Sequence, residues 1–344
     1  MQSVRIHTHG GPEVLRVENL PEPRPAAGEV LVRMLAVSVN HLDLWVRAGM
    51  PGVNLPLPLI LGCDGVGEVV ELGANVAGPA VGTRVVVEPG TSSGTSAHDL
   101  AGNDHLSDDY QIRGEHYDGL CRELVCLPAR QVFPLPQGVD TTVGAAAGLV
   151  YLTAWGMLVS RANLQRGESV LVIGGTSGVG MAAIQIAKHI GARVITTAST
   201  AEKRKHTLQL GADHALDPTQ AGWEREVRGL TAGRGADVVV EHVGPATWDQ
   251  SMRTLGRNGR LVTCGGTTGP KVSVTLPHLF MKNLSVLGST MGPRAALPQI
   301  FANIQSGAYR PTVDRVLPLS QVAAAHELLE ARKVTGKIVL IPGA

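Results

Sequence analysis

Aromatic residues and cysteines are both scarce in this chain. Phe, Tyr and Trp make up 3% of the 344 residues, while glycine occurs 42 times, which is typical of a compact α/β protein with many tight turns and not of a disordered or fibrous one. The four cysteines form no C-x-x-C pair and resemble no secreted disulfide framework, so free thiols of a cytoplasmic protein are expected. The opening residues, MQSVRIHTHGG, contain no apolar signal region.

Net charge is also small. At +1 it argues against a nucleic-acid or membrane-surface role driven by bulk electrostatics. Residues 141–160 carry no charge, but several glycines dilute their hydrophobicity and Asp140 and Arg161 bound them closely. No second segment of this kind exists, so the stretch is predicted to be a buried helix and not a membrane span.

The most informative stretch is residues 168–200, ESVLVIGGTSGVGMAAIQIAKHIGARVITTAST. Residues 169–173 form a β-branched and leucine run, as a strand buried on both faces requires. A glycine-rich turn follows, then apolar residues with helical spacing from Met181 until Gly191, then a second strand over residues 193–197. This βαβ pattern predicts a turn whose glycines let the backbone approach a diphosphate at a helix N-terminus.

The glycine spacing departs from G-x-G-x-x-G. Gly175 and Gly180 hold the outer places, Ser177 takes the middle one and Gly178 follows it. A strand-to-helix turn without a ligand is the alternative interpretation. Its position between a strand and a helix of the right length favours nucleotide binding.

The end of the second strand predicts which cofactor binds. NAD-specific sites place an acid there for the ribose 2′-hydroxyl, whereas this chain has Ala198, Ser199 and Thr200, followed by the cations of Lys203, Arg204 and Lys205. Hydroxyl and cationic groups suit a 2′-phosphate, so NADP(H) is predicted. The alternative is that the cations are a solvated helix face.

Residues outside this unit complete the outline. Residues 1–88 are rich in strand patterns, residues 89–117 form a long polar loop, and residues 125–136 return to strand and proline turns. Residues 236–241 and 260–264 are predicted parallel strands that end near Gly244, Gly265 and Gly266. Ligands in such sheets lie outside the carboxyl ends of the strands, so these turns are expected to face the cofactor.

Several segments together resemble the medium-chain dehydrogenase/reductase superfamily over essentially the whole chain. They are NHLDLWVRAG (40–49), PLILGCDGVGEVVELG (58–73), VGTRVV (81–86), LTAW (152–155), KHTLQLGADHALD (205–217), GRGADVVVEHVG (233–244) and GKIVL (336–340). The resemblance implies an α/β chain with a GroES-like, β-rich catalytic domain from residues 1–150 and 290–344. A Rossmann domain with a doubly wound parallel sheet is expected over residues 151–289.

The departures from the family pattern concern its metals. Zinc alcohol dehydrogenases hold a catalytic zinc at places that match Asn40, Cys63 and Leu149, and these three residues cannot close a zinc site. Four cysteines of a second, structural zinc match Ser93, Ser96, Asp99 and Ser107, so no metal is expected there either. An alternative is a substitute site built from five residues of the same loop, namely His98, Asp99, His105, Asp108 and Asp109.

The Asn40 and Asp64 pattern resembles zinc-free quinone oxidoreductases, whereas the retained loop resembles the zinc dehydrogenases. The resemblance implies a zinc-independent, NADPH-dependent transfer of hydride to a quinone, an enone or a related carbonyl, because a conjugated acceptor needs less help than a plain alcohol. The alternatives are a zinc-type alcohol dehydrogenase with atypical ligands and a nucleotide-binding protein without turnover.

Five residues are candidates for catalysis. Asn40 is a possible amide donor or a structural amide, and Asp43 either orients His41 or caps a helix. Tyr151 lines a pocket or packs in the core, and Thr153 matches a family position beside the nicotinamide. Residues expected to contact the cofactor are Thr153, Gly175, Thr176, Ser177, Gly178, Val179, Ser199, Thr200, Lys203, His242, Val243, Gly265, Gly266 and Lys337. The resemblance further implies a homodimer or homotetramer that pairs through the strand near residues 284–289.

Overall fold

The computed structural model describes residues 1–50 and 52–343, and the chain divides into two compact units. The first unit comprises Met1–Leu149, Pro293–Ser306 and Pro311–Ala344. The second comprises Val150–Gly292 and Gly307–Arg310. The two units are therefore described separately.

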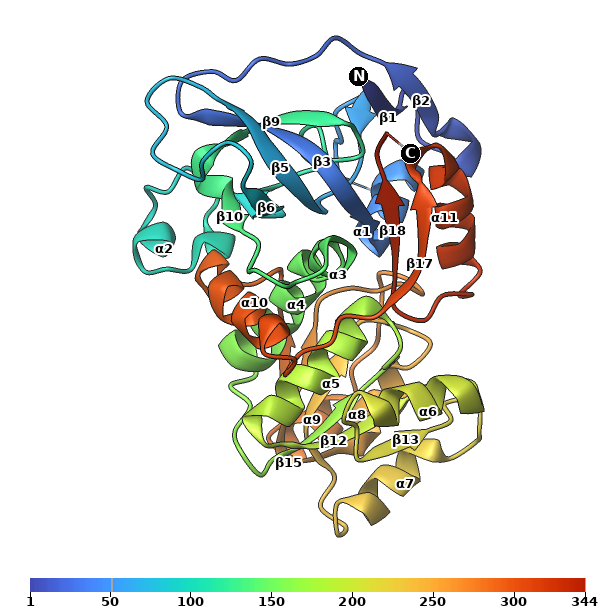
Figure 1. Ribbon diagram of the computed structural model, residues 1–344. Helices are drawn as coiled ribbons and strands as arrows, with labels where there is room; N and C mark the ends of the chain where they lie inside the picture. The colour runs from blue at the N-terminus through green and yellow to red at the C-terminus, as the bar shows by residue number, and fades with distance from the viewer. Residues whose placement is uncertain (51, 344) are drawn as a thin grey trace. The chain divides into compact units, whose positions relative to one another are not determined.

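The main sheet of the first unit is organised around β3 (Glu29–Val39), a valine-rich strand that is buried along most of its length (Figure 1). The sheet order is β10-β6-β5-β3-β18-β17, with β9 also paired to β3. Only β17 and β18 run parallel to each other; the other pairs are antiparallel. The remaining strands are β5 (Asp64–Leu72), β6 (Arg84–Val87), β9 (Leu124–Pro128), β10 (Val132–Pro134), β17 (Val313–Pro318) and β18 (Lys337–Ile341).

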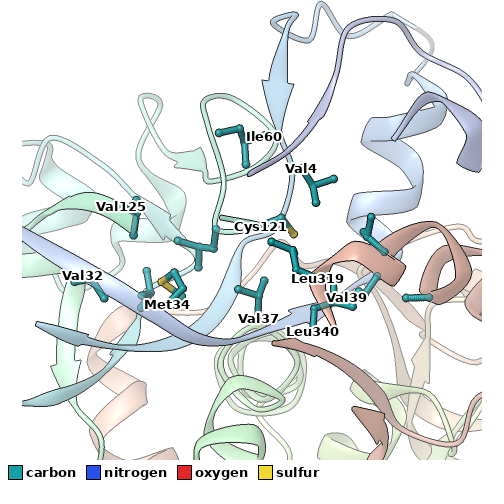
Figure 2. Close-up of a cluster of buried hydrophobic side chains, with 14 of the residues drawn as sticks. Val4, Val32, Met34, Val37, Val39, Ile60, Cys121, Val125, Leu319 and Leu340 are labelled. Carbon is teal, nitrogen blue, oxygen red and sulfur yellow. The ribbon is translucent and has the colours of Figure 1, made fainter. Parts of the chain in front are cut away.

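A smaller antiparallel sheet accompanies the main one. It is made of β2 (Arg16–Asn19), β1 (Gln2–Ile6) and β4 (Leu59–Ile60). Side chains from both sheets meet in one core, in which Val4, Val37, Ile60, Cys121 and Leu340 converge (Figure 2). The core fixes the positions of β3, β5 and β18, which carry the polar residues described below.

The second unit holds a six-stranded parallel sheet in the order β13-β12-β11-β14-β15-β16 (Figure 1). This order, with the first strand next to the fourth, is that of a Rossmann fold, so the predicted doubly wound sheet is confirmed. Its strands are β11 (Ser169–Val172), β12 (Arg193–Thr197), β13 (His214–Leu216), β14 (Ala236–Glu241), β15 (Leu255–Thr263) and β16 (Ser285–Gly288). Its helices are α5 (Gly178–Ile190), α6 (Ala201–Gln209), α7 (Trp223–Leu230), α8 (Trp248–Thr254) and α9 (Leu276–Met281).

The uncharged stretch over residues 141–160 is not the single helix that its composition predicts. It forms α3 (Thr141–Ala145), α4 (Gly148–Trp155) and a π-helical turn (Gly156–Arg161). Gly156 explains the change of winding, because a Cβ atom there would lie 1.9 Å from the carbonyl oxygen of Met291. No helix in the described ranges is both long and apolar enough to cross a membrane.

The polar loop over residues 89–117 has local structure of its own. It contains the short pair β7 (Gly90–Thr91) and β8 (Gln111–Ile112), α2 (Ala97–Leu100) and a 3₁₀ turn (Asp104–Leu106). The other helices of the first unit are α1 (His41–Ala48), α10 (Leu297–Gln305) and α11 (Val322–Glu330). Further 3₁₀ turns cover Pro12–Val14, Ala129–Gln131, Arg294–Ala296 and Leu319–Gln321.

Candidate active site

The glycine turn of the second unit joins β11 to α5. The helix begins at Gly178, three residues before the apolar pattern predicts, because Ser177 caps it: the Ser177 hydroxyl accepts a hydrogen bond from the Gly180 amide at 2.9 Å. The turn is tied to β12 through Gly174 and Gly175, whose amides donate to Thr197. A serine in the middle of the glycine motif is thus a helix cap.

Two glycines of this turn leave no room for a side chain. A Cβ atom on Gly175 would lie 2.1 Å from Oγ1 of Thr196, and one on Gly180 would lie 2.3 Å from the carbonyl oxygen of Gly174. The strand, the turn and the helix therefore pack closely, as a backbone that approaches a diphosphate requires.

Three amides at the start of α5 are left for a ligand. The N–H groups of Thr176, Gly178 and Val179 donate no hydrogen bond to any residue that the structure describes. They lie at the positive end of the helix dipole, which favours an anion. These residues fit the diphosphate of a nicotinamide dinucleotide, which would bind to these amides.

His242 follows β14 and lies next to the same turn. Its Nε2 atom is 2.7 Å from the hydroxyl of Ser177, and its Nδ1 atom is buried without a hydrogen-bond partner among the described residues. Burial lowers the pKa of His242, so the ring is neutral at pH 7. The buried Nδ1 atom is left for a ligand, as a donor or as an acceptor according to the tautomer of the ring.

Glu241 holds this strand end in place. Its carboxylate accepts hydrogen bonds from the amides of Val243 and Gly244 at 2.6 and 3.0 Å and from the hydroxyls of Thr247 and Ser251. The carboxylate is fully buried and satisfied by four donors, so it fixes the backbone after His242. Gly266, after β15, packs against Gly269. A Cβ atom on Gly266 would lie 2.5 Å from the Gly269 carbonyl oxygen.

The end of β12 presents no acidic side chain. Ser199 is exposed, and Thr200 caps α6 by accepting from the Lys203 amide at 3.2 Å. Of the predicted cations, Arg204 is engaged elsewhere, because it donates to Asp217 at 2.8 Å and to the carbonyl oxygen of Ala198 at 3.1 Å. Arg204 is therefore a half-buried, paired cation and not part of a solvated helix face.

The catalytic candidates of the first unit are brought together by strand register. Ser38 of β3 lies opposite Asp64 of β5 on one side and opposite Val339 of β18 on the other. Alternation along a strand puts Ser38 and Asn40 on one face, and it puts Lys337 on the same face as Val339. Asn40 directly follows β3, so it meets Asp64 of β5 and Lys337 of β18 at neighbouring positions of the sheet.

These side chains form a buried polar cluster. The Lys337 ammonium donates to Oδ1 of Asn40 and lies 3.9 Å from Oδ2 of Asp64. The Asn40 amide nitrogen is 3.3 Å from the carbonyl oxygen of Ser38 and 3.8 Å from Sγ of Cys63. Asp64 also accepts from the hydroxyl of Ser38 at 3.3 Å and from the backbone amide of Leu149 at 3.2 Å.

Burial dominates the electrostatics of this cluster. It raises the pKa of Asp64 to about 6 against the opposing charge of Lys337, and it raises the pKa of the Cys63 thiol well above its usual range. It also lowers the pKa of Lys337, although the carboxylates favour the charged form.

Asp43 is a helix cap, as one of its two sequence-based interpretations predicts. Its carboxylate accepts from the Asn40 amide at 2.7 Å and from the Gly62 amide at 3.0 Å, which joins the start of α1 to the segment before β5. Burial raises the pKa of Asp43 to about 6, and these two hydrogen bonds oppose the shift. Both carboxylate oxygens are committed to the backbone.

Comparison with known proteins identifies the family. The model of the "Alcohol dehydrogenase GroES-like domain" matches residues 26–137, and that of the "Zinc-binding dehydrogenase" matches residues 178–306. A quinone oxidoreductase from Pseudomonas aeruginosa is 32% identical over 351 residues, which cover 98% of this chain and 99% of that protein. The chain belongs to the medium-chain dehydrogenase/reductase superfamily.

Solved structures of this superfamily agree over the whole chain. An NAD-dependent alcohol dehydrogenase superposes with a TM-score of 0.96 at 43% identity and covers 100% of both chains. A mycobacterial protein complexed with NADPH superposes with a TM-score of 0.83 at 32% identity, covering 99% of this chain and 100% of that one. The medium-chain dehydrogenase/reductase identification and the two predicted domain types are confirmed, and this chain is an oxidoreductase.

The residues present do not fit the zinc ion that this family's description implies. At the three matching places, Asn40 offers an amide, Cys63 a buried thiol whose raised pKa disfavours the thiolate, and Leu149 only backbone atoms. The Lys337 ammonium contacts Asn40 directly, and an ammonium group has no lone pair with which to bind a metal ion. Across residues 1–50 and 52–343, no group of three His, Cys, Asp or Glu side chains is placed to hold a metal.

The loop residues that match the structural zinc site of relatives form a hydrogen-bond network. The carboxylate of Asp99 accepts from the hydroxyl of Ser92, from the Ser96 amide at 2.9 Å and from the Ser107 hydroxyl at 3.4 Å. Ser107 also donates to Asp109 at 2.6 Å. The hydrogen bond from Ser92 is the largest cause that lowers the pKa of Asp99 to about 2. The Asp99 carboxylate is therefore ionised at neutral pH, and its hydrogen bonds to serine hydroxyls hold the loop together.

The remaining candidates are His41 in the first unit and Tyr151 and Thr153 in the second. His41 begins α1, and its ring lies 6.5 Å from that of Trp45. Tyr151 is buried in the second unit, where its ring stacks on Tyr309 at 5.3 Å and its hydroxyl accepts from Gln185 at 2.9 Å. Thr153 lies with its hydroxyl 3.9 Å from the sulfur of Met291.

Sequence reasoning did not associate Lys337 with Asn40. The resemblance implies a cofactor contact for Lys337, which stays a prediction, but 297 residues separate the two partners. The signal that could have found the contact is the alternation of GKIVL as a strand beside β3, and strand order is not readable from one sequence.

Proposed function

We propose that this protein is a zinc-independent, NADPH-dependent reductase that transfers a hydride to a quinone, an enone or a related conjugated carbonyl compound. The observation that carries the proposal is the replacement of a metal-ligand set by Asn40, Cys63 and Leu149, with the Lys337 ammonium in contact with Asn40. A plain alcohol or carbonyl needs a strong Lewis acid, whereas a conjugated acceptor spreads the incoming charge over its own atoms.

The residues of each unit perform separate tasks. A bound nicotinamide supplies the hydride. The free amides of Thr176, Gly178 and Val179 bind the diphosphate, and His242 restrains the turn through Ser177. In the first unit, the polar cluster offers hydrogen-bond donors to the oxygen that gains negative charge, and a proton on that oxygen completes the two-electron reduction.

NADPH is the proposed cofactor because Ser199 and Thr200 stand where NAD-specific sites carry an acid. The relative described as NAD-dependent makes NADH the competing choice. We expect NADPH to bind at least tenfold more tightly than NADH in a fluorescence titration. Ser199→Asp should weaken NADPH binding about tenfold through charge repulsion, whereas the neutral, equally large Ser199→Asn should change it less than threefold. Tighter binding of NADH by the unaltered chain would refute the cofactor proposal.

Activity is tested by NADPH oxidation with 1,4-benzoquinone, 9,10-phenanthrenequinone and methyl vinyl ketone, beside alcohol oxidation with NADP⁺ and NAD⁺. We expect turnover with at least one conjugated acceptor and less than one hundredth of that rate with ethanol or cyclohexanol. Stoichiometric zinc whose removal by a chelator abolishes activity would favour the zinc-type alcohol dehydrogenase. Tight NADPH binding without oxidation of any acceptor would favour a non-catalytic nucleotide-binding protein.

We further propose a homodimer or homotetramer in the cytoplasm that pairs through β16. This strand is at the edge of its sheet, and large apolar side chains near it are exposed, with Leu276, Phe280 and Met281 each 65% or 66% exposed. Light scattering should give a multiple of the 36.0 kDa chain mass, and Val286→Lys should shift it toward the monomer. A monomer at micromolar concentration would refute this assembly.

A further inference from the structure

A lysine that is almost completely buried in the first unit is uncommon. Lys337 is 4% exposed, at the first position of β18, and its ammonium group contacts Oδ1 of Asn40. Buried lysines lose hydration and are found where a partner or a reaction needs the charge. Asp64, at 3.9 Å, is the nearest opposite charge.

Lys337 has unused hydrogen-bond donors, whereas Asn40 has none. The Asn40 amide has two hydrogens, and both face an acceptor, the carbonyl oxygen of Ser38 and the sulfur of Cys63. The Lys337 ammonium has three hydrogens, of which one is donated to Asn40. Within the described ranges the Lys337 ammonium makes no other hydrogen bond, and Asp64, at 3.9 Å, is too distant for a good one.

The surrounding charges hold this ammonium in place. Asp64 is itself held by the Ser38 hydroxyl and the Leu149 amide, and Asn40 is held by Asp43 through its backbone. Nζ is therefore held between Asn40, which follows β3, and Asp64, the first residue of β5, and these two strands are paired. A fixed donor with unused hydrogens is what stabilisation of a developing oxyanion requires.

We propose that Lys337 is a catalytic residue whose ammonium group binds the acceptor oxygen and takes over the electrostatic task of the metal ion in zinc-dependent relatives. This inference rests on the proposed reductase function. The hydride, with its two electrons, passes from the reduced nicotinamide to an acceptor carbon, and the π electrons of the conjugated carbonyl move onto its oxygen. Lys337 stabilises that negative charge and passes a proton to the oxygen, and solvent water returns a proton to Nζ.

The test compares Lys337→Met and Lys337→Arg with the unaltered chain. We expect Lys337→Met to lower kcat/KM for the quinone about 100-fold with kcat as the main component, while the Kd for NADPH changes less than threefold. Lys337→Arg keeps a cationic donor and should retain at least a tenth of the activity. Across 1,4-benzoquinones of falling reduction potential, the defect of Lys337→Met should grow, because poorer acceptors depend more on oxyanion stabilisation.

The matched control is Arg47→Met, which removes another buried cation of the same unit. Arg47 is 2% exposed and contacts Glu330, His326 and the carbonyl oxygen of Gly10, but no member of the cluster. It should lower the melting temperature and leave kcat/KM within threefold. Should Lys337→Met fold poorly, Lys337→Arg and the acceptor series are measured on the folded fraction and decide the question.

Three results would overturn the assignment. One is an equal, acceptor-independent loss in Lys337→Met and Arg47→Met, which would show a purely structural role. Another is a loss confined to the Kd for NADPH, which would make Lys337 the cofactor ligand that its sequence position implies. The third is that the unaltered chain reduces no acceptor, in which case the proposed function fails and this assignment fails with it; the first two leave the function intact.

Discussion

Glu88 gives a prediction that can be worked out from the structure in detail. The residue follows β6, its side chain is 2% exposed, and its Oε2 atom has no hydrogen-bond partner among the described residues. Burial raises the pKa of Glu88 to about 8, against the charge of Arg294, whose Nε atom lies 3.8 Å away. At neutral pH the folded chain therefore keeps this carboxyl largely protonated, whereas the unfolded chain ionises it.

The sign follows from proton linkage. Between the unfolded pKa of 4.5 and the folded pKa of about 8, the folded state binds one more proton at Glu88 than the unfolded state does. The free energy of unfolding should therefore fall as the pH rises through this window, by about 1.4 kcal/mol per pH unit. Glu88→Gln removes the titration, so its stability relative to the unaltered chain should rise by about 2.5 kcal/mol between pH 5.5 and 7.5.

Urea unfolding followed by circular dichroism at several pH values measures this difference. The slope with pH is the readout, because any packing change caused by the amide is the same at every pH. Glu168→Gln is the matched control: the Arg260 hydrogen bonds lower the pKa of Glu168, so its effect should be constant above pH 5.5. Parallel profiles of Glu88→Gln and the unaltered chain would refute the reasoning.

Three further predictions concern the glycine turn, the polar loop and the buried tyrosine. Gly180→Ala should weaken NADPH binding at least tenfold and lower the melting temperature, because its Cβ atom would lie 2.3 Å from the Gly174 carbonyl oxygen; Gly229→Ala, in a helix with nothing within 4 Å, should not destabilise. Asp99→Asn should destabilise the first unit above pH 4 and lose that effect toward about pH 2, where the unaltered carboxylate also becomes protonated, as acid unfolding curves will test. Tyr151→Phe should cost about 1 kcal/mol of unfolding free energy, through one lost hydrogen bond, and leave kcat/KM within threefold if the residue only packs.

The strand, glycine turn and helix proposed to bind the cofactor were largely predictable from the sequence. The turn between β11 and α5 is local, so a short run of strand, glycine and helix patterns is enough to indicate a diphosphate site. The start of the helix was missed for a local reason. Ser177 caps α5, which begins at Gly178, and apolar spacing does not reveal a first turn that is rich in glycine. The single helix predicted over residues 141–160 is instead broken between Ala145 and Gly148, and its winding changes at Gly156, where the backbone of Met291 approaches closely.

Residue identity by itself determined the loss of the metal ligands, because the capacity of Asn40 or Leu149 to bind zinc is a property of the side chain and needs no coordinates. Tertiary structure alone decided what those positions contact instead. Lys337 is 297 residues from Asn40 in the chain. Only the order and register of β5, β3 and β18 bring its ammonium group to the Asn40 amide, at a place where zinc-dependent relatives have a metal ligand. The physical reason is that strand pairing is set by burial of whole faces, which depends on every strand of the sheet together and not on any one segment.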